Sequence, residues 1–203
     1  MKNFYGLVLV LVLVLVLLSG CSTVKPTVIE YKLSLKDLDK NTLSKGCQDK
    51  SLRVSQAFSS SSLKSLNMNY TLGDSKIYSY SQAQWNNSPN QEITSQIVQL
   101  LREAKLFKTT QSSKSRSVSD YILETTIEDF MQYYDEKITS SYVNVSIHMS
   151  LIDVKTNKVV ASKRFVKRIK TSSLDAEGGV KALNMALKEI LKESLEFLEG
   201  VCK

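Results

Sequence analysis

The chain has 203 residues, a length that suits one domain and allows a sizeable core. Its 27 lysines and arginines against 20 aspartates and glutamates give a net charge of +7, a modest excess that serves solubility or attracts an anionic lipid or protein face. A single histidine, and no Cys-x-x-Cys, Gly-x-Ser-x-Gly or phosphate-cradling glycine loop, argue against a metal site, a serine hydrolase and a nucleotide site. We therefore expect no cofactor, no metal and no catalytic residue.

Residues 1–20 have the pattern of a secretory signal. Lys2 precedes an unbroken Leu/Val run over 7–18, and small residues follow. The run is shorter than the roughly 20 residues of a transmembrane helix. A protein exported in this way is not expected to meet nucleic acid.

The end of that run, Leu18-Ser19-Gly20-Cys21, resembles the lipobox of bacterial lipoproteins. The resemblance implies cleavage between Gly20 and Cys21 and attachment of lipid to Cys21, which would anchor the protein to a membrane. Two or more acyl chains hold a protein stably on a bilayer. The alternative is an ordinary signal peptide followed by a free cysteine.

With Cys21 acylated, Cys47 and Cys202 remain. Two thiols in an oxidising compartment suggest a disulfide between them. Two unpaired thiols, or bonds between molecules, are the alternatives.

A short polar tether, residues 21–27, leads into a domain over 28–203. Residues 28–35 are rich in β-branched and aromatic side chains and predict a first strand. A polar loop is expected over 36–50 and a second strand over 51–58.

A hairpin is expected next, because alternating runs over 66–70 and 76–80 flank a Gly-Asp turn at Gly73. A strong helix start follows. Ser88 suits the N-cap with Pro89 at the first position, and Gln91 completes a capping box. The helix should run over 89–105, and a short strand is expected over 106–110. The apolar face of this helix is formed by Ile93, Ile97, Leu100, Leu101 and Ala104.

Three long strands are predicted in the second half, over 121–128, 143–151 and 159–169, each from apolar and polar alternation. The last two should form a hairpin with a turn near Thr156. A final helix should begin at Asp175 as N-cap and stop at Gly200 as the residue after its end.

Few residues suggest a contact function. Trp85, just before a capped helix, fits a rim that meets a partner, but we favour the alternative, a side chain that closes the core. Arg164, Arg168 and Lys170 share one face of a predicted strand and form a basic patch suited to anionic lipid or an acidic partner, or to plain solvation.

An ordered set of residues carries a resemblance to a known family. In chain order they are Tyr31, Leu33, Tyr80, Ala83, Trp85, Pro89, Asp120, Tyr121, Leu123 and Glu128-Asp129-Phe130. With these elements in place, the chain resembles the ABC-type transport auxiliary lipoproteins, the partners of transporters that carry mammalian-cell-entry domains. The resemblance implies a periplasm-facing, non-catalytic subunit that supports movement of phospholipid or other hydrophobic cargo between the inner and outer membranes. It also implies contact with the transporter's substrate-binding component and a homo-oligomer such as a ring.

The sequence thus predicts a single α+β domain, with a mostly antiparallel or mixed sheet and two main amphipathic helices packed on it. Ser22, where an aspartate would signal retention at the inner membrane, favours the outer membrane of a Gram-negative cell. A structural lipoprotein that stabilises or pilots an envelope complex, without handling cargo, is the alternative function.

Overall fold

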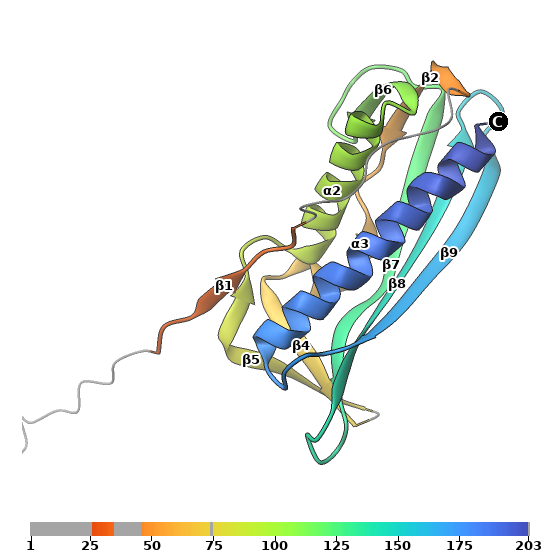
Figure 1. Cartoon of the computed structure of the whole chain (residues 1–203). Coiled ribbons are helices and arrows are strands. Elements are labelled where there is room, and N and C mark those ends of the chain that lie inside the picture. Colours follow the sequence, from red (N-terminus) through yellow and green to blue (C-terminus); the bar gives the residue numbers. More distant parts are fainter. Residues whose placement is uncertain (1–25, 35–45, 74, 203) are drawn as a thin grey trace, which may run out of the picture.

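A computed structural model describes residues 26–34, 46–73 and 75–202 (Figure 1). The signal and the acylation motif lie outside these residues. The described elements, in chain order, are β1 (Ile29–Tyr31), β2 (Cys47–Val54), β3 (Phe58–Ser59), a 3-10 turn (Ser61–Lys64), β4 (Asn67–Leu72), β5 (Lys76–Trp85), α2 (Pro89–Ala104), β6 (Phe107–Ser112), β7 (Tyr121–Tyr134), β8 (Ser141–Asp153), β9 (Lys158–Lys170) and α3 (Ala176–Val201).

The described strands form one mixed sheet of nine strands with β7 at its centre. One edge of β7 pairs along its length with β8, which pairs in turn with β9, both antiparallel. The other edge is shared by β2, β3 and β4, which all pair with β7 in parallel. Strand β6 extends the sheet beyond β2, and β5 and β1 extend it beyond β4. The predicted single α+β domain is confirmed.

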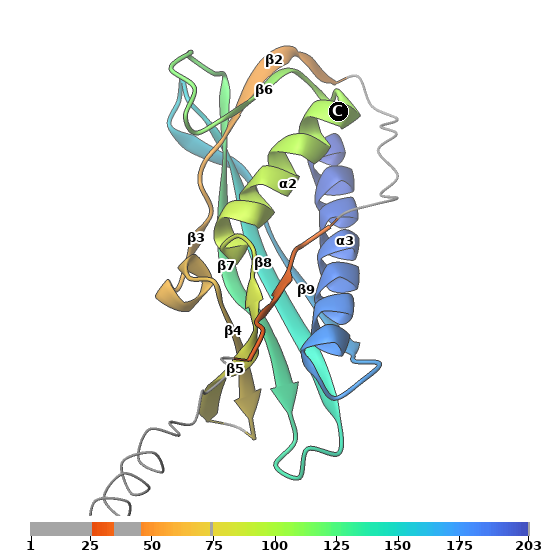
Figure 2. The same cartoon turned by 90° about the vertical axis from the view of Figure 1, so that its left-hand side faces the viewer.

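Helices α2 and α3 lie side by side on one face of the curled sheet (Figures 1 and 2). The apolar stripe of α3 is buried against β8 and β9, with Leu187, Ile190 and Leu191 fully enclosed. The predicted apolar face of α2 is buried as well. The alternation expected for β8 is confirmed, because Val143, Val145, Ile147, Met149 and Leu151 are all inaccessible to solvent.

Strand β7 changes its buried face at a bulge. Up to Ile127 the odd-numbered residues point to the core, but the register with β8 shifts between Ile127 and Asp129. An extra residue in one strand reverses the alternation that follows it, so Phe130, Gln132 and Tyr134 are buried instead.

The hairpins and the start of α2 are where the sequence places them. Gly73 occupies the left-handed region with φ 62° in the turn between β4 and β5. The hairpin of β8 and β9 turns at Asn157, which also has positive φ.

Four local expectations were wrong. The second strand, expected over 51–58, ends at Val54, and a separate short strand, β3, begins at Phe58. The loop expected to Lys50 already belongs to β2 from Cys47, because this polar segment pairs with β6. Helix α3 continues through Gly200 and ends after Val201. Ser88 is the N-cap of α2, but its side chain makes no capping bond; its backbone oxygen instead accepts from the amides of Gln91 and Glu92.

Candidate functional site

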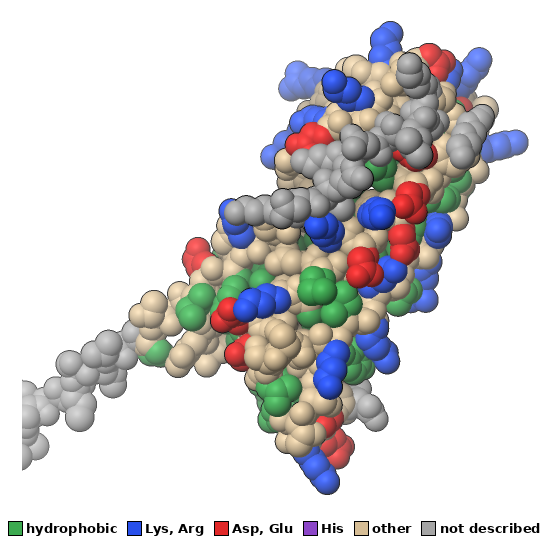
Figure 3. All heavy atoms as spheres, viewed as in Figure 1, with side chains coloured by type: hydrophobic (Ala, Val, Ile, Leu, Met, Phe, Trp, Pro, Cys, Tyr) green, Lys and Arg blue, Asp and Glu red, His purple; other side chains and the backbone are tan. Residues whose placement is uncertain are grey.

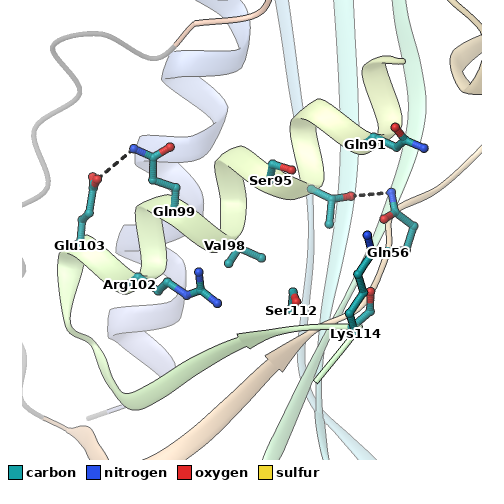
Figure 4. A pocket seen from close by; sticks show the side chains of 11 residues that line it. Gln56, Gln91, Ser95, Val98, Gln99, Arg102, Glu103, Ser112 and Lys114 are labelled. Atoms are coloured by element: carbon teal, nitrogen blue, oxygen red, sulfur yellow. Dashed lines mark hydrogen bonds between the residues drawn. The ribbon is translucent and has the colours of Figure 1, made fainter. Parts of the chain in front are cut away.

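An open groove of about 690 Å³ lies between helix α2, the segment that follows β2, and the end of β6 with the residues after it (Figure 4). The apolar side of α2 packs on the sheet, so its polar side lines the groove. Gln91, Ser95, Gln99 and Arg102 recur at helical spacing on that side. Gln56 and Lys114 line the groove from the strand side.

Hydrogen bonds fix the floor of the groove. The Thr94 hydroxyl donates to the carbonyl of Asn90 (2.6 Å). It accepts from the Gln56 side-chain amide (3.1 Å) and from the backbone amide of Ala57 (3.0 Å). On the wall, Nε of Arg102 donates to the carbonyl of Thr110 in β6 (2.9 Å). The helix and the strands are therefore held together by polar contacts on this side.

The groove has a cationic character. The side chains of Arg102 and Lys114 approach it from opposite walls (Figure 4). A neighbouring hollow shares Arg102 and adds Lys105 and Lys108. Glu103 is the acidic residue of the lining, and its carboxylate accepts from Gln99 (2.9 Å). Amides, hydroxyls and cations suit a polar or acidic protein segment better than an acyl chain, which needs an apolar lining.

Sequence reasoning missed this groove. Its two cations come from segments on either side of β6, and Gln56 comes from the strand-side region before the first hairpin. The available signal was the run of polar residues at helical spacing on the solvent side of α2.

The predicted basic patch lies on the face of β9 that points away from the helices. Its neighbours Phe165 and Lys167 point to α3, where the Lys167 ammonium pairs with Glu193 (2.5 Å). The even-numbered Arg164, Arg168 and Lys170 therefore lie on the opposite, exposed face.

Two of these cations have acidic or aromatic neighbours. Arg164 forms an ion pair with Glu128, whose pKa is lowered by the hydrogen bond from Ser146 and by Arg164 itself. The guanidinium of Arg168 lies 4.4 Å from the ring centroid of Tyr142. The patch is thus partly neutralised at the bulge, and its positive charge increases toward Lys170.

Trp85 does not form a rim. Its side chain is 4% exposed and packs on Phe130 with ring centroids 6.0 Å apart. The structure corrects the suggested contact role in favour of the alternative, a side chain that closes the core.

A disulfide joins Cys47 and Cys202, with Cα atoms 5.1 Å apart. The proposed acylation site Cys21 and cleavage position Gly20 lie outside the described residues. Among the described residues no group of three His, Cys, Asp or Glu could hold a metal. His148 Nε2 lies 2.7 Å from the hydroxyl of Ser162. In the same part of the chain, no helix is long and apolar enough to cross a membrane.

The comparisons with known proteins give a family and two solved structures of similar fold. The model of a family described as ABC-type transport auxiliary lipoprotein component matches residues 31–193. Among curated proteins, none matches the chain. The crystal structure of protein XCC0632 from Xanthomonas campestris, of the family model DUF330, is 18% identical with TM-score 0.71, covering 87% of this chain and 93% of that one.

Two further crystal structures are similar. One, of an uncharacterized protein, is 16% identical with TM-score 0.64 and covers 85% of this chain and 99% of that one. Another is a PelC dodecamer from Paraburkholderia phytofirmans, 15% identical with TM-score 0.43, covering 74% and 92%.

Proposed function

This chain belongs to the family of ABC-type transport auxiliary lipoprotein components, and from that premise we propose a more specific role. The protein is a non-catalytic subunit anchored through lipid on Cys21. It faces the periplasm from the outer membrane and supports a transporter whose substrate-binding component carries mammalian-cell-entry domains. The cargo is phospholipid or another hydrophobic molecule that moves between the two membranes.

The observation that carries this proposal is the extent of the family match. It spans residues 31–193, almost the whole predicted mature domain, and so concerns the folded body and not the signal. Nine residues lie between Cys21, the last residue of the lipobox, and the start of the matched region at Tyr31. Domain and anchor together fit a subunit that is held at a bilayer and works through contacts with other proteins.

The groove beside α2 supports contact with a protein partner. Its polar lining offers hydrogen-bond donors and the cations Arg102 and Lys114, which complement carboxylates on a partner surface. Cargo would then be handled by the transporter, with this chain fixing the transporter's position. The exposed Lys170 end of β9 is a second surface for an acidic partner or anionic lipid.

Affinity purification of the acylated protein from native membranes tests the proposal. We expect a mammalian-cell-entry-domain protein and its permease to co-purify, with phospholipid in the complex. Recovery of a secretin or a pilus component instead would favour the structural or piloting role.

Matched variants test the groove. The pair Arg102→Gln and Lys114→Gln removes two positive charges from the groove, and Lys155→Gln with Lys192→Gln removes two exposed charges elsewhere. The first pair should reduce capture of the transporter at least tenfold, and the second should leave it unchanged. Equal capture by both would exclude the groove. In the same assay, Arg164→Glu with Arg168→Glu tests the patch on β9, and unchanged binding to both partner and vesicles would count against it.

A further inference from the structure

One end of the domain carries two neighbouring turns with exposed apolar side chains. The turn between β4 and β5 lies against the turn between β7 and β8, because the amide of Gly73 donates to the carbonyl of Tyr134 (3.0 Å). A side-chain carbon at Gly73 would meet Cγ of Glu136 at 3.2 Å. The two turns therefore form a single tip, which we call the hairpin end.

The hairpin end projects beyond the core. At the start of β5, consecutive side chains point to opposite faces of the sheet, yet Ile77 is 65% exposed and Tyr78 is 45% exposed. Both faces of the strand are therefore open here. Across the tip, Ile138 in the turn after β7 is 51% exposed. In Figure 3, separate groups of apolar side chains lie among charged ones in the lower half of the visible face, with charged side chains at its lowest tip.

Ile138 also has an unfavourable backbone. It lies at φ 54°, in the left-handed region that a β-branched residue rarely adopts. Asparagine or glycine would suit that conformation, and either would remove the exposed apolar side chain. Strained positions of this kind cluster at functional sites, such as those that contact a ligand.

The chain enters the domain from the same end. Strand β1 is parallel to β5, with Ile29 paired to Ala83, so its N-terminal side faces the start of β5 at Lys76. Ala83 lies six residues beyond Ile77, which is less than about 20 Å along the sheet because β5 is irregular between Ser79 and Gln84. Four residues lie between Cys21 and Pro26, and the five Cα–Cα steps can span at most about 18 Å. The opposite end of the sheet is much farther, since β7 alone is about 43 Å long.

From these relations we infer that the hairpin end rests in the membrane interface, with Ile77, Tyr78 and Ile138 among the lipid headgroups and upper acyl carbons. The inference depends on the anchor proposed at Cys21. Tyrosine suits this zone, since its ring is apolar and its hydroxyl meets water. Lys76 and Lys137 at the tip are offset by Asp135 and Glu136. Lys170, which pairs with Tyr142 beside this tip, adds an exposed positive charge, so apolar insertion is accompanied by attraction to anionic headgroups.

Tryptophan placed at each end of the molecule tests the inference. Tyr78→Trp reports on the hairpin end, and Val118→Trp, at a position 86% exposed near the start of β7, is the matched control. The natural Trp85 gives a constant background, because it is buried. The proteins are acylated, purified from membranes and reconstituted in phosphatidylethanolamine–phosphatidylglycerol vesicles with or without brominated acyl chains.

In the Tyr78→Trp protein, we expect a blue shift on reconstitution and at least a twofold loss of the added emission with brominated lipid. The Val118→Trp protein should show neither. The inference is overturned if the two variants show the same emission shift and quenching, or if brominated lipid quenches neither. Ile138→Trp repeats the measurement from the second turn.

The anchor itself is checked separately. Mass and vesicle flotation show whether Cys21 is acylated before any fluorescence is read. If it is not, the mature chain starting at Cys21 is coupled through that thiol to a maleimide phospholipid, with Cys47 and Cys202 engaged in their disulfide. The orientation of the tethered domain is then read as before, so failure of the anchor and failure of the hairpin contact give different results.

Discussion

Cys47, the first residue of β2, is bonded to Cys202, the residue that follows α3, across 155 positions of sequence. The bond joins the edge of the sheet that carries β6 to the end of the longest helix. The bond thereby cross-links two segments that lie near opposite ends of the folded chain's sequence.

Loss of this bond should destabilise the domain strongly. Cross-linking so long a loop restricts the unfolded chain, and removal of such a disulfide costs about 3–5 kcal/mol. We expect reduction, or the pair Cys47→Ser and Cys202→Ser, to lower the free energy of unfolding by that amount in urea titrations. Thiol counting on the native protein is the control, and two reactive thiols there would contradict the bond.

Opposite effects are expected from two glycine substitutions in α3. A side-chain carbon at Gly179 would overlap the amide oxygen of Gln132, which lies in a buried network with Tyr80 and Tyr134. Gly179→Ala should therefore cost about 1–3 kcal/mol. At Gly200 nothing lies within 4 Å, so Gly200→Ala should gain about 0.5 kcal/mol from helix propensity. Thermal unfolding of both variants measures the two changes in stability. A change in the same direction for both would refute the prediction.

Relief of the strained turn should stabilise the protein. Ile138→Asn replaces a β-branched residue at φ 54° with one that tolerates the left-handed region. We expect a gain of about 1 kcal/mol in the free energy of unfolding, with Lys137→Asn in the same turn as the control. If the hairpin end contacts lipid, the same change should weaken vesicle insertion. A loss of stability would show that the backbone is not strained there.

The start of α3 should respond to acid. Asp175 accepts from the amide of Gly178 (2.8 Å), and this bond, followed by the one from Ser173, lowers the pKa of its carboxyl. A lowered pKa in the folded state means that the contribution is present above the unfolded value and is lost as pH falls through the folded one. Asp175→Ala should cost about 1 kcal/mol at neutral pH and clearly less near pH 2. An equal cost at both would exclude the cap as the cause.

Local sequence patterns predicted the elements that are determined by residue alternation and by the residues at helix ends. The alternation from Val143 to Leu151 gave β8 because one face of that strand is covered by α3. Pro89 after Ser88 gave the start of α2 correctly even though the serine side chain makes no capping bond, since the fixed φ of proline suits the first helical position.

Long-range relations could not be read in this way. The polar segment beginning at Cys47 is a strand only because β6 and β7 supply its partners. Helix α3 passes through Gly200 because the disulfide at Cys202 and the buried Leu198 hold its last turn. The bulge at Glu128 and the groove between Arg102 and Lys114 arise from pairing and packing between distant segments, which sequence spacing does not encode.

The position of β7 has a consequence for how the protein reaches its compartment. For a chain translocated N-terminus first, β2, β3 and β4 emerge before the strand whose edge all three share. The backbone N–H and C=O groups that these strands pair with β7 stay unpaired until β7 is present. Unpaired strand edges promote aggregation. For a chain translocated in this way, these three strands pair with β7 only after Tyr134 has emerged, and the bond between Cys47 and Cys202 forms later still.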